Sequence, residues 1–273
     1  MKTLNNHTLL YDEDCPVCNI YTSGFIKAKM LDSQGRKPFE LISTEEIDYI
    51  DIERAKNEIA LVDKKNKKVY YGIESLLKVI GNSFPWMEKV GNWKPINYLL
   101  KKLYKLISYN RRVIAPSKIK NENNIQCVPS FNIRYRVLYI LFATLLTVLT
   151  LFKYAELITL LPKANFSREL VLAFGQIVFQ YLFIQKLSKQ KQLDYIGNLV
   201  TVSIMGSLVL LPVLLLNQFM LVNEYIILGW FGLTVNLMIL EHYRRTKVLE
   251  LPKYLTITWI LYRIIALIMI LRF

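Results

Sequence analysis

The sequence predicts an α/β domain at the N-terminus, followed by an all-α transmembrane bundle of about five helices. Short apolar runs alternate with charged turns through residue 115, whereas from residue 136 onward the charges form short clusters between long apolar stretches. The apolar share of 53% and the mean hydropathy of +0.27 are also high for a soluble protein. This contrast is typical of a water-exposed domain joined to a membrane domain. We expect domains at 1–115 and 136–273, with a linker at 116–135.

Local patterns in the first domain predict a small mixed sheet with helices. Pro16 suits a first helical turn, and apolar residues recur after it at helical spacing. Two apolar runs that flank a Lys/Asn-rich turn predict a β-hairpin. The expected elements are a strand at 9–11, a helix at 16–28, a strand at 39–42, partly helical chain at 46–57, hairpin strands at 59–62 and 69–71, and helices at 73–80 and 95–107. The last helix has leucines on one face, which would close a core or lie on a membrane surface.

Five apolar stretches follow the linker, and each approaches the roughly 20 residues that a helix needs to cross a bilayer. Pro212 is expected to kink the third stretch or to mark its end. The stretches lie at about 136–158, 168–187, 195–216, 221–241 and 254–272.

The distribution of Lys and Arg predicts how these spans are oriented. Cations are concentrated before the first span, at 186–191 and at 244–253, and none lies between the third and fourth spans. No apolar signal segment precedes Asp12. We therefore expect an integral protein of the cell (inner) membrane, with the first domain in the cytoplasm and Phe273 on the opposite side.

The net charge of +14 does not require a nucleic-acid partner. Many of the cations lie beside membrane spans or at the hairpin tip, and no nucleic-acid motif accompanies them. The three cysteines are too few for a disulfide framework. The expected surroundings are a lipid bilayer and no nucleic acid.

Cys15 and Cys18 form a CxxC motif at the start of a helix that follows a strand. The first sulfur would lie among unpaired N–H groups at the positive end of the helix, which favours the nucleophilic thiolate. We expect Cys15, at the helix tip, to be the exposed attacking sulfur and Cys18, one turn inside, to be the shielded sulfur that resolves the mixed disulfide. The acidic turn Asp12-Glu13-Asp14 opposes thiolate formation. Asp12 or Asp14 is expected either to relay a proton to Cys18 or to cap the helix, with capping favoured for Asp14.

A zinc site is the alternative for this motif, but it would need two more ligands. Cys127, His7 and His242 are the remaining candidates, and none is paired at a zinc-knuckle spacing. We therefore favour redox chemistry and expect no metal and no cofactor. Cys127 is expected to be inert, although exchange with the Cys15 pair is the alternative.

The segment Tyr11-Asp12-x-Asp14-Cys15-Pro16-Val17-Cys18 resembles the DCC family of thiol-disulfide oxidoreductases, whose hallmark is Asp-x-x-Cys-x-x-Cys near the N-terminus. The resemblance covers about residues 7–113 and includes the hairpin and, weakly, Tyr109-Asn110-Arg111. It implies a thioredoxin-like fold with Cys15 and Cys18 as the redox pair. Two features depart from the pattern: Glu13 stands where the family usually has Gly, and residues 56–58 lack the proline that thioredoxins have before this hairpin.

The membrane domain carries polar residues at depth. Arg263 lies in the middle of the last span, Gln176 and Gln180 are four residues apart in the second, and Asn236 is in the fourth. Such residues form functional sites or hydrogen bonds between helices. We expect Arg263 to face the bundle interior, near the side-chain carbonyls of both glutamines. Haem is improbable, since His242 at a span end is the one histidine of this domain.

Two functions are compatible with these patterns. The first is a protein-disulfide oxidoreductase that exchanges electrons with a disulfide-bearing protein or a small thiol through Cys15 and Cys18, with Asp12 assisting. The second is a membrane module that binds or transports a quinone, a lipid or a partner helix, with the first domain as a redox sensor. The spans cannot pass electrons by thiol exchange, because no cysteine follows Cys127.

Overall fold

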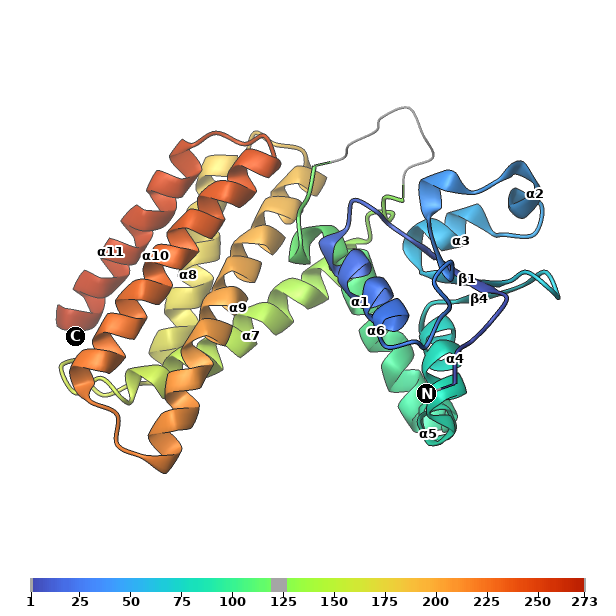
Figure 1. The fold of residues 1–273 in the computed structure, drawn as a ribbon. Coiled ribbons are helices and arrows are strands. Elements are labelled where there is room, and N and C mark those ends of the chain that lie inside the picture. The colour runs from blue at the N-terminus through green and yellow to red at the C-terminus, as the bar shows by residue number, and fades with distance from the viewer. Residues whose placement is uncertain (1, 119–126, 273) are drawn as a thin grey trace. The chain divides into compact units, whose positions relative to one another are not determined.

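The computed structural model describes residues 2–118 and 127–272. Its chain forms two compact units, residues 1–135 and 136–273 (Figure 1), which are described separately below. Residues 119–126 of the expected linker lie outside the described residues. The other end of that linker is helical, because the first helix of the second unit begins at Ile133.

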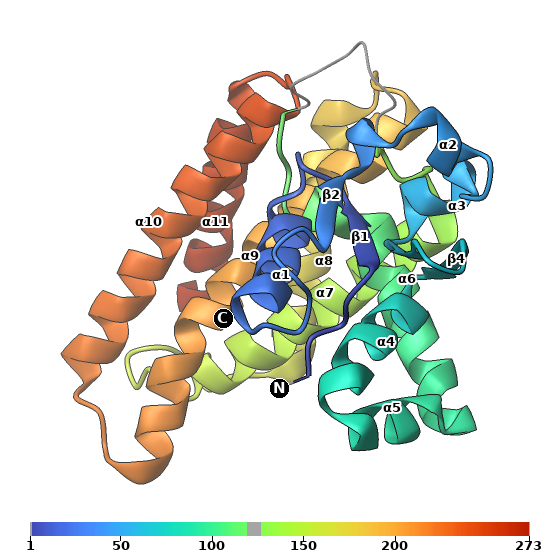
Figure 2. The same cartoon turned by 45° about the vertical axis from the view of Figure 1, so that its right-hand side comes forward.

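A four-stranded mixed sheet of order β2-β1-β3-β4 forms the centre of the first unit. Strand β1 (His7–Tyr11) pairs in parallel with β2 (Arg36–Pro38) and antiparallel with β3 (Ala60–Asp63). Strand β4 (Lys68–Tyr71) pairs antiparallel with β3, which confirms the predicted hairpin. Strand β1 is therefore a central strand, and the residues that follow it begin at its carboxyl end. Figure 2 shows β1 beside β2.

The strand predicted at 39–42 is wrong. Strand β2 ends at Pro38, and the 3-10 turn η1 (Phe39–Leu41) follows it. Proline has no N–H to donate and ends the ladder. The turn then buries Phe39 in the core and leaves Leu41 exposed.

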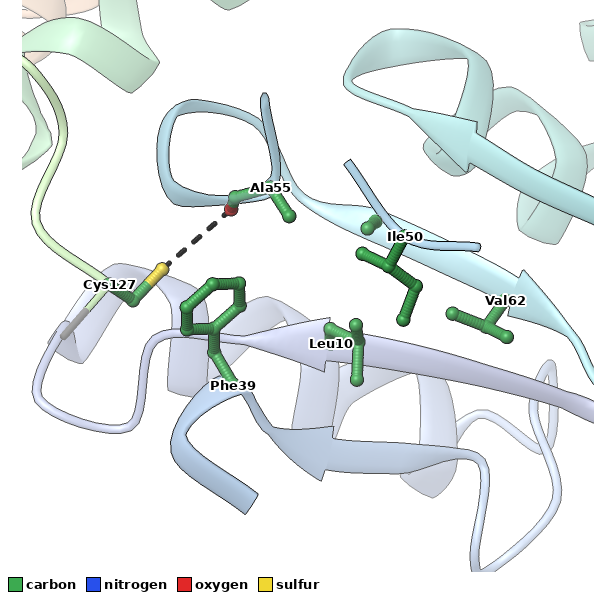
Figure 3. Close-up of a cluster of buried hydrophobic side chains, with 7 residues drawn as sticks. Leu10, Phe39, Ile50, Ala55, Val62 and Cys127 are labelled. Carbon is green, nitrogen blue, oxygen red and sulfur yellow. Dashed lines mark hydrogen bonds between the residues drawn. The ribbon is translucent and has the colours of Figure 1, made fainter. Parts of the chain in front are cut away.

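Six helices accompany the sheet, and apolar side chains pack on both of its faces. Leu9 and Leu61 lie in a cluster with Val79, whereas their neighbours Leu10 and Val62 lie in a second cluster on the opposite face (Figure 3). This alternation is the two-residue period of strands. The helices are α1 (Pro16–Lys27), α2 (Thr44–Ile47), α3 (Ile52–Asn57), α4 (Ile73–Ser83), α5 (Pro85–Asn92) and α6 (Lys94–Ile114). The expected helices are confirmed. Helix α5 is an additional helix that the sequence did not predict.

Helix α6 is longer than predicted and does not close the core with its leucine face. Leu99 and Leu103 are largely exposed, whereas Asn110, Arg111 and Val113 are buried near its C-terminal end. The contacts of α6 with the interior therefore come from Tyr104, which packs against the cluster of Leu9, and from the last turns, which include a buried cation.

The second unit contains the helices α7 (Ile133–Ala155), α8 (Phe166–Ile184), α9 (Lys189–Phe219), α10 (Glu224–Val248) and α11 (Tyr254–Arg272). Among the described residues, four of them, all but α8, are long and apolar enough to cross a membrane. Pro212 lies inside α9, which continues to Phe219, so it does not mark the end of the helix. The chain therefore combines an α/β unit with an all-α unit, as expected.

Helix α8 occupies the predicted second span, but its polar residues lower its mean hydropathy. It buries Glu169, Gln176 and Gln180, while it exposes apolar side chains such as Val178 and Leu182. This is the reverse of a surface helix in water. It is the arrangement of a membrane helix that turns polar groups toward its neighbours and apolar groups toward lipid.

Helices α8 to α11 pack side by side, with α9 against α10 and α8 against α11 (Figure 1). Helix α7 is attached through buried hydrogen bonds. Tyr139 Oη lies 2.7 Å from Thr201 Oγ1 on α9, and Tyr154 Oη donates to the Ile227 carbonyl on α10 at 2.8 Å. All five helices thus belong to one packed bundle.

Gly72 precedes α4 in a conformation that other residues avoid, with φ +60° and ψ −131°. We expect Gly72→Ala to lower the free energy of unfolding by about 1–3 kcal/mol, because this region is essentially restricted to glycine. Gly24→Ala, inside α1 with no outside atom within 4 Å of the added methyl, should raise it by about 0.5–1 kcal/mol. Thermal unfolding of the detergent-solubilised protein measures both changes. Equal midpoints for the two variants would contradict the special backbone requirement at Gly72.

Candidate functional site

The CxxC motif lies at the carboxyl end of β1, where the chain turns into α1. The Cys15 N–H donates to the Asp12 carbonyl at 3.2 Å and closes the turn. Cys15 is the N-cap residue, and Pro16 occupies the first helical turn. The Cys15 side chain makes no cap hydrogen bond, and Cys15 occupies the N-cap position that was expected for Asp14. The open N–H groups and the positive helix end are therefore left to the Cys15 sulfur.

The two thiols differ strongly in acidity. The hydrogen bond from the Cys18 thiol lowers the pKa of Cys15 to about 7, with further help from the Cys18 N–H and from Arg111, and against burial and Asp12. The same hydrogen bond and burial raise the pKa of Cys18 far above that of an ordinary thiol. Cys15 is therefore the sulfur that ionises near neutral pH, while Cys18 keeps its proton.

Both sulfurs are shielded, which corrects the expectation that Cys15 is exposed. Cys15 is 1% exposed and Cys18 8%. They pack with Tyr11, Val17 and Tyr21. Since a thiolate must approach a disulfide in line, the groups that cover Cys15 have to move before a substrate sulfur can reach it.

Asp12 is buried beside the pair and is held by two arginines. Its Oδ2 lies 3.3 Å from Arg111 Nε and 3.4 Å from an Arg112 nitrogen. Its Oδ1 accepts the Asp14 N–H at 3.1 Å. Within residues 2–118 and 127–272, no hydrogen bond joins Asp12 to either sulfur. The carboxylate thus shapes the turn and anchors the arginines, and a direct proton relay to Cys18 has no hydrogen bond to follow.

Arg111 links several segments of the first unit. Besides Asp12, its guanidinium donates to the Lys56 carbonyl at 2.9 Å and to the Cys127 carbonyl at 2.7 Å. The residues before β3, which lack a proline, therefore contact the site through Arg111. Its role was missed in the sequence, where the one signal was the weak similarity around Tyr109-Asn110-Arg111.

Cys127 lies in the core cluster on one face of the sheet, with Leu10 and Phe39 (Figure 3). Its sulfur accepts from Arg111 at 3.3 Å and donates weakly to the Ala55 carbonyl at 3.9 Å. Burial raises its pKa to about 12. The sulfur is therefore a protonated packing group at neutral pH, which favours the inert alternative.

The backbone at Glu13 does not require the glycine that is usual at this position in the family that the motif resembles. The non-glycine residues with positive φ in the described chain are Asn6, Lys29, Lys67 and Glu250. The turn before Cys15 is thus compatible with an ordinary L-residue at this position.

Two tyrosines surround Cys18 in a setting of low polarity. Burial raises the pKa of Tyr21 and of Tyr104 well above that of a free phenol. The Tyr104 hydroxyl accepts the Ile59 N–H at 2.8 Å. Both phenols stay protonated, so Arg111 is the charge that favours a thiolate here.

The polar residues of the membrane unit do not form the single group that was expected. Gln180 accepts from the Tyr195 hydroxyl at 2.6 Å and exchanges hydrogen bonds with Thr258. Gln176 and Arg263 instead line one cavity. Among the described residues, no hydrogen bond joins Arg263 to either glutamine, and no group of three metal-ligating side chains is found.

Comparison with known proteins finds a family that is similar to the first unit. Residues 9–115 match the family described as DCC1-like thiol-disulfide oxidoreductase. The match begins within β1, contains both cysteines and Arg111, and ends after α6. Neither a curated protein nor a solved structure matches the chain.

Arg111 and Asp12 should shift the ionisation of Cys15 in opposite directions. We expect Arg111→Met to raise the midpoint of Cys15 alkylation from pH about 7 by about one pH unit, because the nearest cation is removed. Asp12→Asn should lower it, because a nearby anion is removed. The rate of iodoacetamide modification at Cys15, followed by peptide mass spectrometry across pH, measures both. Arg54→Met, at a partly exposed ion pair, is the matched control, and a shift of equal size in it would refute the assignment.

Proposed function

We propose, from the match of residues 9–115 to the DCC1-like thiol-disulfide oxidoreductases, that this protein is a membrane-bound enzyme that exchanges electrons with a disulfide through Cys15 and Cys18. The observation that supports this most directly is the unequal acidity of the two thiols at one helix N-terminus. An attacking thiolate and a protonated resolving thiol are the two species that disulfide exchange needs.

The reaction runs in two steps. The Cys15 thiolate attacks one sulfur of a substrate disulfide, a mixed disulfide forms, and the other substrate sulfur leaves as a thiolate that takes a proton. Cys18 then loses its proton and attacks the Cys15 sulfur. The Cys15–Cys18 disulfide forms and the second substrate sulfur is released as a thiol, so that two electrons and two protons reach the substrate. The reverse sequence oxidises a dithiol.

Arg111 and Asp12 support this chemistry without bonding to the sulfurs. Arg111 lowers the pKa of Cys15 by its charge. Asp12 holds Arg111 and the turn in place, and we assign it a positioning role. Once the mixed disulfide has formed, the Cys15 sulfur is neutral and no longer needs a nearby cation to stabilise it.

The cysteine variants test the assignment. Cys15→Ser should reduce dithiothreitol-driven reduction of insulin by the full-length protein to background, because the nucleophile is lost. Cys18→Ser should accumulate a mixed disulfide at Cys15, visible as a mass adduct that a reductant removes. Cys127→Ser should retain activity within about twofold, since that thiol is buried and protonated. Retained activity in Cys15→Ser would overturn the proposal.

The substrate class is a protein disulfide or a small-molecule disulfide on the cytoplasmic side of the cell (inner) membrane. The cation clusters before α7, between α8 and α9, and between α10 and α11 support this orientation. The short connection between α9 and α10 contains no Lys or Arg.

The number of crossings decides the side on which the chain ends. If α8 crosses together with the four more apolar helices, Phe273 lies opposite the redox unit; if it does not, both lie on one side. We expect a green fluorescent protein fused after Phe273 to be dark and alkaline phosphatase at the same point to be active. A fluorescent fusion would instead indicate an even number of crossings.

A further inference from the structure

The membrane unit contains a partly open cavity of about 460 Å³, and all five of its helices contribute to the lining. This volume lies within the range of small-molecule sites. At about 30 Å³ per non-hydrogen atom, the share of a water molecule in the liquid, it holds roughly fifteen such atoms. Because the cavity is partly open, the end of a longer chain can extend beyond it. The cavity therefore suits one hydrocarbon chain rather than the two chains of a lipid.

Several polar groups that line this cavity lack hydrogen-bond partners in the described parts of the chain. Gln176 is 4% exposed, and neither atom of its amide is bonded. The indole N–H of Trp259, 1% exposed, and the Nε of Arg263 are also unsatisfied. An unmet polar group in a hydrocarbon environment costs several kcal/mol. Gln176 lies on α8, whereas Trp259 and Arg263 lie on α11. Because α8 and α11 pack against each other, one bound molecule can form hydrogen bonds with all three groups.

The charge of the cavity is positive. The Arg263 guanidinium lies over the Trp259 ring, 4.8 Å from its centre. The acid of the lining, Glu169, is already paired with Arg168 at 2.8 Å. The Tyr262 hydroxyl is also occupied, since it donates to the Leu172 carbonyl at 2.7 Å. Among the described residues, Arg263 forms no ion pair.

The remaining lining is mostly aliphatic. Leu151, Leu172, Ile177, Leu210 and Leu267 surround the cavity. The site thus joins a cation and two unsatisfied N–H donors with an apolar chamber. This is the complement of a molecule with an oxygen-rich anionic head and a hydrocarbon tail.

We propose that this cavity binds a single-chain anionic amphiphile, with its carboxylate on Arg263, Gln176 and the Trp259 indole, and its chain among the leucines. The site is independent of the cysteine chemistry, so its failure would leave the proposed function untouched. It also gives Arg263 the counter-charge that no residue of the described chain supplies.

Contact quenching of Trp259 tests this in the full-length protein in detergent. Trp86, Trp93 and Trp230 are replaced by Phe, and 9,10-dibromostearate is the probe. We expect saturable quenching by the acid and binding weaker by about tenfold or more for its methyl ester, because the ester lacks the charge that pairs with Arg263.

Substitutions then assign the head group. Arg263→Met should weaken binding by about tenfold or more, Arg263→Lys should retain most of it, and Gln176→Leu should weaken it several-fold. The comparison of acid with ester needs no Arg263 variant, so it decides the matter even if Arg263→Met does not fold. Equal quenching by acid and ester, quenching that does not saturate, or unchanged affinity in folded Arg263→Met would each overturn the proposal.

Discussion

The buried pairing of Arg111 with Asp12 is the interaction on which the first unit depends. Asp12 is 3% exposed and Arg111 is 6% exposed, so water solvates neither charge. Removing one partner of such a pair typically costs about 3–5 kcal/mol, because the other charge is left buried. Arg111 also binds the carbonyls of Lys56 and Cys127. The end of β1, the end of α3 and the segment at Cys127 are therefore fixed to α6 by one guanidinium.

The same interaction sets the electrostatics around the cysteines. Asp12 by itself opposes a thiolate at Cys15, although burial opposes it more. The cation beside it reverses part of the effect, and the hydrogen bond from Cys18 adds the largest contribution. The low pKa at Cys15 thus arises mainly inside the motif, from the thiol and the N–H of Cys18, and Arg111 adds a smaller share that works against the acidic turn.

The membrane unit follows the opposite packing rule from the first unit. In the first unit the sheet buries leucines and valines. In the membrane unit, α8 buries glutamines and exposes apolar side chains. In lipid no free energy is gained by hiding apolar groups, so hydrogen bonds between helices and close packing hold the bundle. Tyr195 illustrates this, because its hydroxyl meets Gln180 on α8 and lies 3.2 Å from His242 on α10. Arg263 and Gln176 remain outside this network and face the cavity.

The sequence by itself determined the features that depend on local periodicity and spacing. These are the central strand before the CxxC motif, the helix that starts at Pro16, the 59–71 hairpin and the long apolar helices of the second unit. Two local errors have local reasons: Pro38 ends β2 before Phe39, and α5, with 8 residues, is too short to show its repeat over more than about two turns.

The tertiary structure alone decided which distant residues meet. Arg111 is 99 residues from Asp12, and no local pattern shows that a cation at the end of a lysine-rich helix turns inward. The burial of Cys15, the separation of Gln176 from Gln180 and the cavity at Arg263 likewise arise from packing. Spacing fixes which face a side chain takes on its own helix or strand, but the partner on that face is set by how separate elements come together.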